Sequence, residues 1–300
     1  MHILVTTDYS PISINAFRYA LHFGRMYQCR ITLVHIYKIQ EINISLETGS
    51  NKVREYFEAD QTKKLNDFRF QILKSIQMNP EKTNTASLAV EGNVSRDLLN
   101  VSNYLNADFI FIGTHGVSGL QNFVVEDHAW KIIQKANIPV FVIPRNAEFT
   151  GIRKIILPTT FIEEELPVID YTVQLAQSLK SSISLFHISK NDIPSETEKK
   201  EGELFIQKYN RQNITKKIEL SILKKDNFLD SIKKFSSIEK AECIVLSNNQ
   251  SFRLANIYPS LFRNTKKLSD QTKIPLLIIP TSYGLKNKKN QLLEMEKISD

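Results

Sequence analysis

The sequence predicts a duplicated α/β protein in which each copy folds as a doubly wound parallel sheet. Short apolar runs, of the kind that forms strands buried on both faces, alternate with longer segments of helical periodicity. Two of these runs, 109–112 and 140–143, are wholly apolar. Alternating strands and helices form parallel sheets with right-handed crossovers, so we expect helices on both faces of each sheet.

An internal repeat explains why the alternation runs twice. The segment Ile3–Asp8 corresponds to Ile155–Thr160, and Ile31–Ile36 corresponds to Ile183–Ile188, both with a spacing of 152 residues. Self-similarity of this kind indicates that one structural unit occurs twice. The first strand, the first helix and the second strand therefore recur without a gap.

The later part of the repeat sets the expected domain boundaries. Residues 138–144 match residues 274–280 at a spacing of 136, which makes the second copy 16 residues shorter than the first. We expect a first domain over residues 1–148, a second over 149–283 and a polar tail over 284–300.

Each element of the first copy has its own signal. Ser10 and Pro11 form a helix start in which serine is the cap and proline takes the first helical position. The charged stretch from about Lys52 to Gln77 has apolar residues at helical spacing and predicts a long amphipathic helix. The other expected elements are strands at 31–36, 87–90, 109–112 and 140–143, and a helix marked by Leu98, Val101 and Leu105.

The second copy shows a similar helix start. Thr160 and Glu163 have the spacing of a capping box, in which each side chain accepts the other's backbone N–H. An apolar stripe at helical spacing follows, formed by Leu166, Ile169, Val173 and Ala176. His187 in this copy matches His35 in the first, and two equivalent histidines on buried strands indicate packing and hydrogen bonding rather than ligand binding.

Composition and charge argue against several classes of protein. No stretch has about 18 consecutive apolar residues and the first residues do not resemble a secretory signal, so we expect a cytoplasmic protein without a membrane span. The net charge of +7 is spread along the chain rather than gathered with aromatic residues, which argues against a nucleic-acid partner. Cys29 and Cys243 lie in different copies and suggest neither a disulfide nor a zinc site.

The main candidate site is the turn that follows the strand at 109–112. Gly113-Thr114-His115-Gly116 stands between a strand and a helix, where glycine lets a ligand approach the backbone and the helix start favours phosphate. A turn that needs glycine only for its shape is the alternative. His115 has no second ligand at metal spacing in this turn, so we expect no metal.

This segment resembles the signature of the universal stress protein family. Nucleotide-binding members carry G-x2-G-x9-G-[S/T] there, and Gly113, Gly116 and the nine residues that follow match the pattern. Glu126 and Asp127 stand where the pattern continues with Gly and Ser or Thr. The resemblance implies a Rossmann-like fold of the adenine nucleotide alpha hydrolase type, with strand order 3-2-1-4-5. It also implies that the two sheets pair about a pseudo-twofold axis through their fifth strands.

The resemblance further implies a nucleotide site in the first copy, over the ends of its first and fourth strands. Asp8 would bind the ribose or the base, Ile36 and Ile112 would pack on adenine, and the glycine turn would face phosphate. The implied set is Thr6, Thr7, Asp8, Ile36, Ile112, Gly113, His115 and Gly116, with Glu126 and Asp127 at the remaining phosphate positions. From the residues alone, Asp8 has an equal explanation as the cap of the helix that begins after Ser10.

The acidic pair changes which nucleotide we expect. Carboxylates near a phosphate oppose its binding, so AMP or adenosine should bind better than ATP, with magnesium only as a companion of the nucleotide. The second copy has Thr160 in place of Asp8, and Ser247-Asn248-Asn249-Gln250 in place of the glycine turn. Any nucleotide should therefore bind to the first copy.

We expect a tandem universal stress protein of the cytoplasmic stress response, without catalytic residues. The motifs G-x-x-x-x-G-K-[ST], G-x-S-x-G and H-E-x-x-H do not occur in the sequence. Such a protein would act on an unknown protein partner, as a monomer with an intrachain pseudo-dimer or as a homodimer. The alternative is an enzyme that hydrolyses ATP or AMP, or transfers adenylyl groups, with Asp8 and His115, and weak ATPase activity belongs to this alternative.

Overall fold

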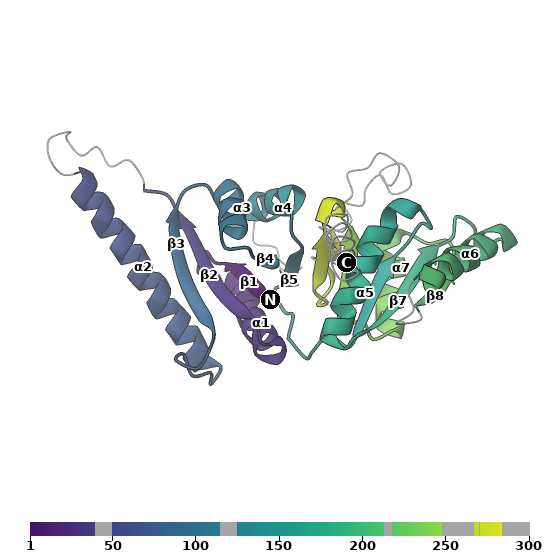
Figure 1. Ribbon diagram of the computed structural model, residues 1–300, viewed down its shortest axis with the longest axis horizontal. Coiled ribbons are helices and arrows are strands. Elements are labelled where there is room, and N and C mark those ends of the chain that lie inside the picture. Colours follow the sequence, from purple (N-terminus) through teal and green to yellow (C-terminus); the bar gives the residue numbers. More distant parts are fainter. Residues whose placement is uncertain (40–49, 115–124, 213–217, 248–266, 270, 284–300) are drawn as a thin grey trace, which may run out of the picture. The chain divides into compact units, whose positions relative to one another are not determined.

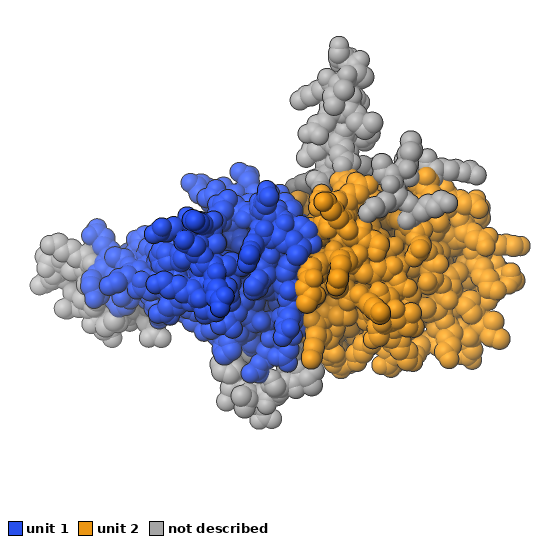
Figure 2. All heavy atoms as spheres, turned by 90° about the horizontal axis from the view of Figure 1, so that it is seen from below, with its two compact units in different colours: residues 1–149 blue, residues 150–300 orange. Residues whose placement is uncertain are grey.

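The computed structural model describes residues 1–39, 50–114, 125–212, 218–247, 267–269 and 271–283. The chain divides into two compact units, Met1–Phe149 and Thr150–Asp300, which Figure 2 shows in different colours. This boundary lies one residue beyond the expected end of the first domain at residue 148. The expected polar tail, 284–300, lies outside the described residues.

The first unit is a parallel sheet with helices on both faces (Figure 1). The sheet order is β3-β2-β1-β4-β5, and every pairing in it is parallel. Its strands are β1 (His2–Thr6), β2 (Arg30–Tyr37), β3 (Thr85–Glu91), β4 (Phe109–Thr114) and β5 (Val140–Pro144). Its helices are α1 (Pro11–Tyr27), α2 (Ser50–Ser75), α3 (Val94–Tyr104) and α4 (Val125–Lys135).

Helix α1 begins as the sequence predicts. Ser10 is the N-cap, its side chain accepts the N–H of Ser13, and proline takes the first helical position. The helix packs aromatic residues on the sheet, where the ring of Phe23 lies 5.5 Å from Phe111 and 5.7 Å from Phe141. This aromatic cluster fixes α1 over β4 and β5 and so positions the turn between β1 and α1.

Helix α2 covers the edge strand β3. It buries Leu65, Ile72 and Leu73 on its inner side, as an amphipathic helix should. Arg69 is also buried, and its guanidinium donates hydrogen bonds to the carbonyl and the hydroxyl of Thr85 in β3 at 2.7 and 2.8 Å. A buried arginine with such partners anchors the helix to the strand.

The second unit repeats the same architecture. Its sheet order is β8-β7-β6-β9-β10, again with parallel pairings. The strands are β6 (Lys154–Pro158), β7 (Ser182–Ile188), β8 (Glu219–Leu223), β9 (Cys243–Ser247) and β10 (Leu276–Ile279). The helical segments are η1 (Glu163–Glu165), α5 (Leu166–Leu179), α6 (Glu196–Gln212) and α7 (Phe228–Ile238).

The doubly wound α/β class and the strand order 3-2-1-4-5 are confirmed in each unit. The expected pairing of the two fifth strands stays a prediction. Among the described helices, none is long and apolar enough to cross a bilayer. Cys29 and Cys243 are both free and buried.

The predicted capping box of Thr160 and Glu163 is wrong. Glu163 lies in the 3-10 turn η1, whose N-cap is Ile162 without a side-chain hydrogen bond. A capping box occurs instead at the start of α6, where Glu198 accepts the N–H of Ser195 at 2.9 Å and Ser195 Oγ accepts the N–H of Glu198 at 3.2 Å. The correct spacing at Thr160 was not enough, because a different carboxylate, Glu165, reaches its backbone N–H.

Candidate functional site

The polar strand ends of the first unit lie at the switch point of the sheet, where the order in which the chain adds strands reverses. Strand β1 stands between β2 and β4, and this switch point is where open α/β sheets bind ligands, at the carboxyl ends of the strands. The register pairs Val5 of β1 with Phe111 of β4. The residues that follow on each strand, Thr6 to Asp8 and Ile112 to Thr114, therefore meet at one edge of the sheet.

Thr7 holds the turn after β1 and is almost fully buried. Its N–H donates to the carbonyl of Val34 at 2.9 Å, and its own carbonyl accepts a 2.8 Å hydrogen bond from Nδ1 of His35. Its hydroxyl accepts the N–H of Tyr9 at 3.0 Å and shares a 3.0 Å hydrogen bond with Ser13 Oγ. All polar groups of Thr7 are thus satisfied within the protein, which indicates a structural role.

Tyr9 is a feature of this turn that the sequence analysis missed. Its backbone is left-handed with φ of 63°, which is uncommon for an aromatic residue. Its ring lies 4.5 Å from the ring of His35 and 5.0 Å from that of Phe68, and Lys64 Nζ lies 4.9 Å from the ring centre. Its hydroxyl is buried and has no hydrogen-bond partner among the described residues. Burial raises the pKa of Tyr9 to about 12, so the phenol stays neutral.

Asp8 points outward from the same turn and is exposed. Its Oδ1 accepts the N–H of Ser10 at 3.0 Å. Burial alone raises the pKa of the Asp8 carboxyl, but hydrogen bonds from Ser10 and Ser13 outweigh it and hold the pKa below its usual value. The alternative that Asp8 caps α1 is wrong, because Ser10 is the N-cap. The turn therefore presents an ionised carboxylate at the carboxyl end of β1.

Gly113 belongs to strand β4, and packing explains why it is glycine. Its φ is not positive, and a Cβ at this position would lie 2.7 Å from Ile12 Cγ2 and 2.8 Å from the Ile12 carbonyl oxygen. Such a distance to backbone requires a shift of α1. The packing explanation therefore accounts for this glycine without a ligand.

Thr114 follows Gly113 and was not predicted as a site residue. It is only 6% exposed, and its hydroxyl has no hydrogen-bond partner in the described parts of the chain. A buried hydroxyl without a partner is uncommon and costs free energy. The sequence signal was available, because Thr114 stands between Gly113 and His115 in the glycine turn.

The other predicted site residues fall into three groups. Thr6 is half-buried at the end of β1, opposite Val34. Ile36 and Ile112 are buried core residues of β2 and β4. His115 and Gly116 lie outside the described residues, as do the side chains of Glu126 and Asp127, whose backbone forms the first turn of α4.

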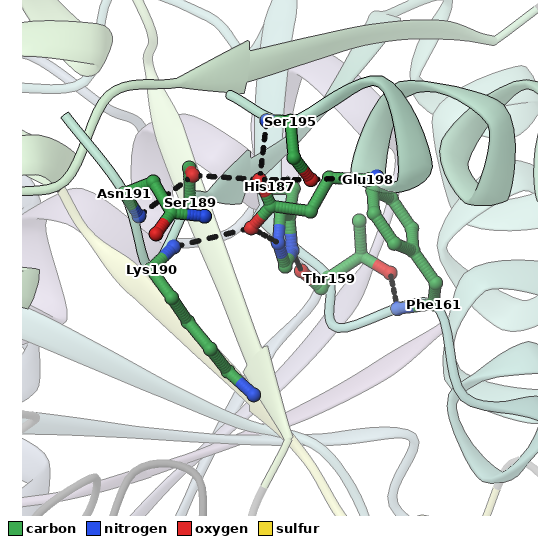
Figure 3. A network of polar contacts seen from close by, with 8 residues as sticks. All are labelled: Thr159, Phe161, His187, Ser189, Lys190, Asn191, Ser195 and Glu198. Carbon is green, nitrogen blue, oxygen red and sulfur yellow. Dashed lines mark hydrogen bonds and ion pairs between the residues drawn. The ribbon is translucent and has the colours of Figure 1, made fainter. Parts of the chain in front are cut away.

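The corresponding turn of the second unit keeps the frame and changes the acid. Nδ1 of His187 bonds the carbonyl of Thr159 at 2.9 Å, and the N–H of Phe161 donates to Thr159 Oγ1 at 3.1 Å (Figure 3). Phe161 is left-handed with φ of 65°, like Tyr9. In place of an exposed carboxylate, the hydroxyl of Thr159 meets the buried carboxylate of Glu165 at 2.6 Å.

Figure 3 also shows what lies on the other side of His187. Its Nε2 is 4.0 Å from Glu198 Oε1, and Glu198 accepts hydrogen bonds from Ser189 Oγ and from the N–H groups of Lys190 and Ser195. The hydrogen bond from the Ser195 backbone is the main cause that lowers the pKa of Glu198 to about 2. Within the described ranges, no three His, Cys, Asp or Glu side chains are placed to hold a metal ion.

The fold is that of a duplicated, doubly wound α/β protein with a polar turn after the central strand of each unit. A family model described as "Universal stress protein family" matches residues 1–144. Residues 1–144 are therefore a domain of the universal stress protein family.

Two relatives each correspond to about half of this chain. The universal stress protein YxiE of Bacillus subtilis (strain 168) is 25% identical over 146 residues, which cover 47% of this chain and 97% of that protein. The universal stress protein MJ0577 of Methanocaldococcus jannaschii is 25% identical over 152 residues, which cover 48% of this chain and 94% of that protein.

A solved structure resembles the chain over most of its length. The crystal structure of a universal stress protein from Archaeoglobus fulgidus DSM 4304 has a TM-score of 0.67 and is 11% identical. It covers 93% of this chain, and 98% of its own chain is covered. At this identity the likeness shows the fold.

Proposed function

We propose that this chain is a tandem universal stress protein that binds an adenine nucleotide in its first unit and acts on a protein partner in the cytoplasm without catalysis. The observation that carries the proposal is the Asp8 carboxylate. It is exposed, hydrogen bonds keep it ionised, and it stands at the carboxyl end of β1 beside the switch point of the sheet. The family resemblance gives this position to the group that binds the ribose or the base.

A second polar group lies across the switch point. Thr114 ends β4, the strand that pairs with β1, and its buried hydroxyl has no partner among the described residues. A ligand held between Asp8 and Thr114 would receive one charged acceptor and one hydroxyl. Ribose hydroxyls suit Asp8, because a carboxylate accepts hydrogen bonds from donors of this kind.

The start of α4 favours a short phosphate chain. Glu126 and Asp127 occupy the first helical turn, where free N–H groups otherwise attract anions. Two acids at this place oppose a β- or γ-phosphate, so AMP or adenosine binds better than ATP. A magnesium ion that bridges the acids and the triphosphate reverses this order.

Calorimetric titration of the full chain with AMP tests the proposal. Asp8→Ala removes a charged hydrogen-bond acceptor and should weaken AMP binding by roughly tenfold to a hundredfold. Asp67→Ala, which removes an exposed carboxylate from α2, is the matched control and should bind AMP like the wild type. Equal AMP affinity in Asp8→Ala and Asp67→Ala would refute a role for Asp8.

The enzyme alternative needs its own assay. Purified protein is incubated with ATP and magnesium, and ADP, AMP and pyrophosphate are quantified. We expect no turnover above background. Turnover that disappears in Asp8→Ala and persists in Asp67→Ala would replace the binding proposal with an enzymatic function at the same strand ends.

A further inference from the structure

We propose that the turn after β6 in the second unit is a binding site for a small oxyanion, and that the chain fills it with the carboxylate of Glu165. Three donors converge on this carboxylate. Thr159 Oγ1 donates to Oε2 at 2.6 Å, Thr160 Oγ1 donates to Oε1 at 2.8 Å, and the N–H of Thr160 lies 3.1 and 3.0 Å from the two oxygens. Both oxygens are held, as an external carboxylate or phosphate would be.

The turn offers the carboxylate one backbone N–H and two hydroxyls, a set of donors that we call the nest. Phe161, which follows Thr160, is left-handed. The N–H of Thr160 points to the Glu165 carboxylate, while that of Phe161 donates to the hydroxyl of Thr159. The Thr159 hydroxyl therefore has its acceptor side occupied and directs its proton to the carboxylate.

Contacts that do not involve Glu165 fix this nest. His187 Nδ1 donates to the carbonyl of Thr159 at 2.9 Å, since a carbonyl can only accept, and the Phe161 ring stacks on the imidazole at 4.3 Å (Figure 3). The N–H of Thr159 donates to the carbonyl of Phe186 at 2.8 Å. The donors are thus held in place by β7, whatever anion they bind.

The first unit shows that such a turn forms without a carboxylate in this position. Ser13 stands where Glu165 stands in the repeat, and its hydroxyl bonds the Thr7 hydroxyl at 3.0 Å. Tyr9 is left-handed and its N–H bonds Thr7 Oγ1, as Phe161 does with Thr159. Glu165 is therefore an occupant of the nest and is not needed to build it.

A small cavity lies beside the carboxylate. Its volume is about 40 Å³, and its described lining includes Glu165, Thr160 and Ser247 among apolar residues such as Leu157, Val168 and Phe228. At about 10 to 15 Å³ per water, this cavity has room for about three waters. Truncation of Glu165 adds the volume of its own side chain, which suits formate or acetate.

Burial explains why the occupant matters. Glu165 is 8% exposed, and burial raises the pKa of its carboxyl while hydrogen bonds from Thr159 and Thr160 lower it. A buried carboxylate is tolerated only with donors of this kind, and donors shielded from water also cost free energy when they have no acceptor. With Glu165 in place, these donors are closed to any external oxyanion.

Chemical rescue in the full chain tests the proposal. Glu165→Ala empties the nest, and sodium formate is the probe, with sodium chloride at equal ionic strength as its control. The readout is hydrogen exchange of the peptide that contains Thr160 and Phe161. The only tryptophan, Trp130, lies in the first unit and would not report on this turn.

We expect the Thr160 N–H to exchange at least tenfold faster in Glu165→Ala than in the wild type. Formate should restore the protection in a saturable way and raise the melting temperature by a few degrees, while chloride should not. Glu163→Ala is the matched control, because it removes an exposed carboxylate of the same turn. Glu163→Ala and the wild type should show no response that is specific to formate.

Three outcomes would overturn the proposal. The first is exchange as slow in Glu165→Ala without formate as in the wild type, and the second is equal protection by formate and chloride. Glu165→Ser, which introduces the residue of the first unit, repeats the measurement if the alanine variant does not fold. Failure of both variants to fold is the third, since the proposal requires the turn to stand without the carboxylate.

Discussion

The turns after β1 and β6 share a backbone and differ in where their carboxylate stands. In both, a buried threonine is bonded to a histidine of the next strand, and a left-handed aromatic residue follows two positions later. Asp8 in the first unit is exposed, whereas Thr160 replaces it in the second and the acid is the buried Glu165. An outward carboxylate can accept hydrogen bonds from a ligand, whereas an inward carboxylate accepts them from donors of its own chain.

The backbone frame of the turn and the group that occupies it are therefore separate properties. The histidine, the threonine and the left-handed turn were kept in both units, which fits a role in connecting neighbouring strands. The position of one acid within six residues then decides whether the strand end is open or filled.

Close packing distinguishes Gly113 of the first unit from its counterpart in the second unit, Ser247. Gly113→Val places side-chain atoms against the backbone of Ile12, so we expect a loss of about 3 kcal/mol of unfolding free energy, at the upper end of overpacking costs. Ser247→Gly removes the 3.2 Å hydrogen bond to Thr281 and should cost about 1 kcal/mol. Urea unfolding of both variants measures the losses. Losses of equal size would contradict the packing explanation of Gly113.

The acidic start of α4 gives the next effect, on ligand choice. A carboxylate at about 4 to 6 Å from a phosphate opposes binding by up to a few kcal/mol at an effective dielectric near 20, or about a hundredfold. Glu126→Gly with Asp127→Ser should therefore raise ATP affinity without magnesium by up to this factor, and AMP affinity much less. Competition titrations with AMP, ADP and ATP, with and without magnesium, measure the order.

The control for this variant lies in the second unit. Glu163→Gly with Glu164→Ser removes two acids from η1 and should leave the nucleotide order of the first unit unchanged. Tight, magnesium-independent ATP binding by the wild type, with no gain in the Glu126/Asp127 variant, would show that these acids do not oppose triphosphate binding.

The repeat and the helix start at Ser10 could be predicted because their signals are local. A spacing of 152 residues shows the duplication, and a serine before proline is sufficient to predict a cap. For Asp8 the residues left a ligand role and a helix cap open; Ser10 takes the N-cap, and the ligand role stays a prediction. The strand order followed only from the family resemblance.

The filled turn of the second unit could not be predicted in this way. Thr160 and Glu163 had the spacing of a capping box, but that rule assumes that the helix begins at Thr160. A 3-10 turn precedes α5, and this turn places the carboxylate of Glu165 against Thr159 and Thr160. The rings of Tyr9 and Phe161, both left-handed residues, contact histidines of the next strand, and no local pattern contains that contact.

The hydroxyl of Tyr9 distinguishes the two aromatic positions. It is buried without a partner in the described part of the chain, so Tyr9→Phe, which copies the second unit, should stabilise the protein by about 1 kcal/mol. The reverse change, Phe161→Tyr, directs a hydroxyl toward Gly202 and should destabilise by a similar amount. Thermal unfolding compares the two. Destabilisation by Tyr9→Phe would show that the hydroxyl contributes a favourable interaction.

The two carboxylates should give opposite pH dependence, and this is the smallest effect because each variant changes a single carboxyl and Asp8 is screened by solvent. Burial raises the pKa of Asp8, but hydrogen bonds from Ser10 outweigh it, so the pKa is lowered in the folded protein. The contribution of Asp8 to stability is therefore present above its unfolded pKa and is lost as the pH falls through the folded value. Burial raises the pKa of Glu165, so its contribution is present below its unfolded pKa and is lost as the pH rises through the folded value. The melting temperatures of the wild type, Asp8→Asn and Glu165→Gln are measured from about pH 3.5 to 8, a range that spans the ordinary carboxyl pKa. The advantage of the wild type over Asp8→Asn should grow with pH, and its advantage over Glu165→Gln should shrink. Two profiles with the same sign would contradict the opposite pKa shifts of the two acids.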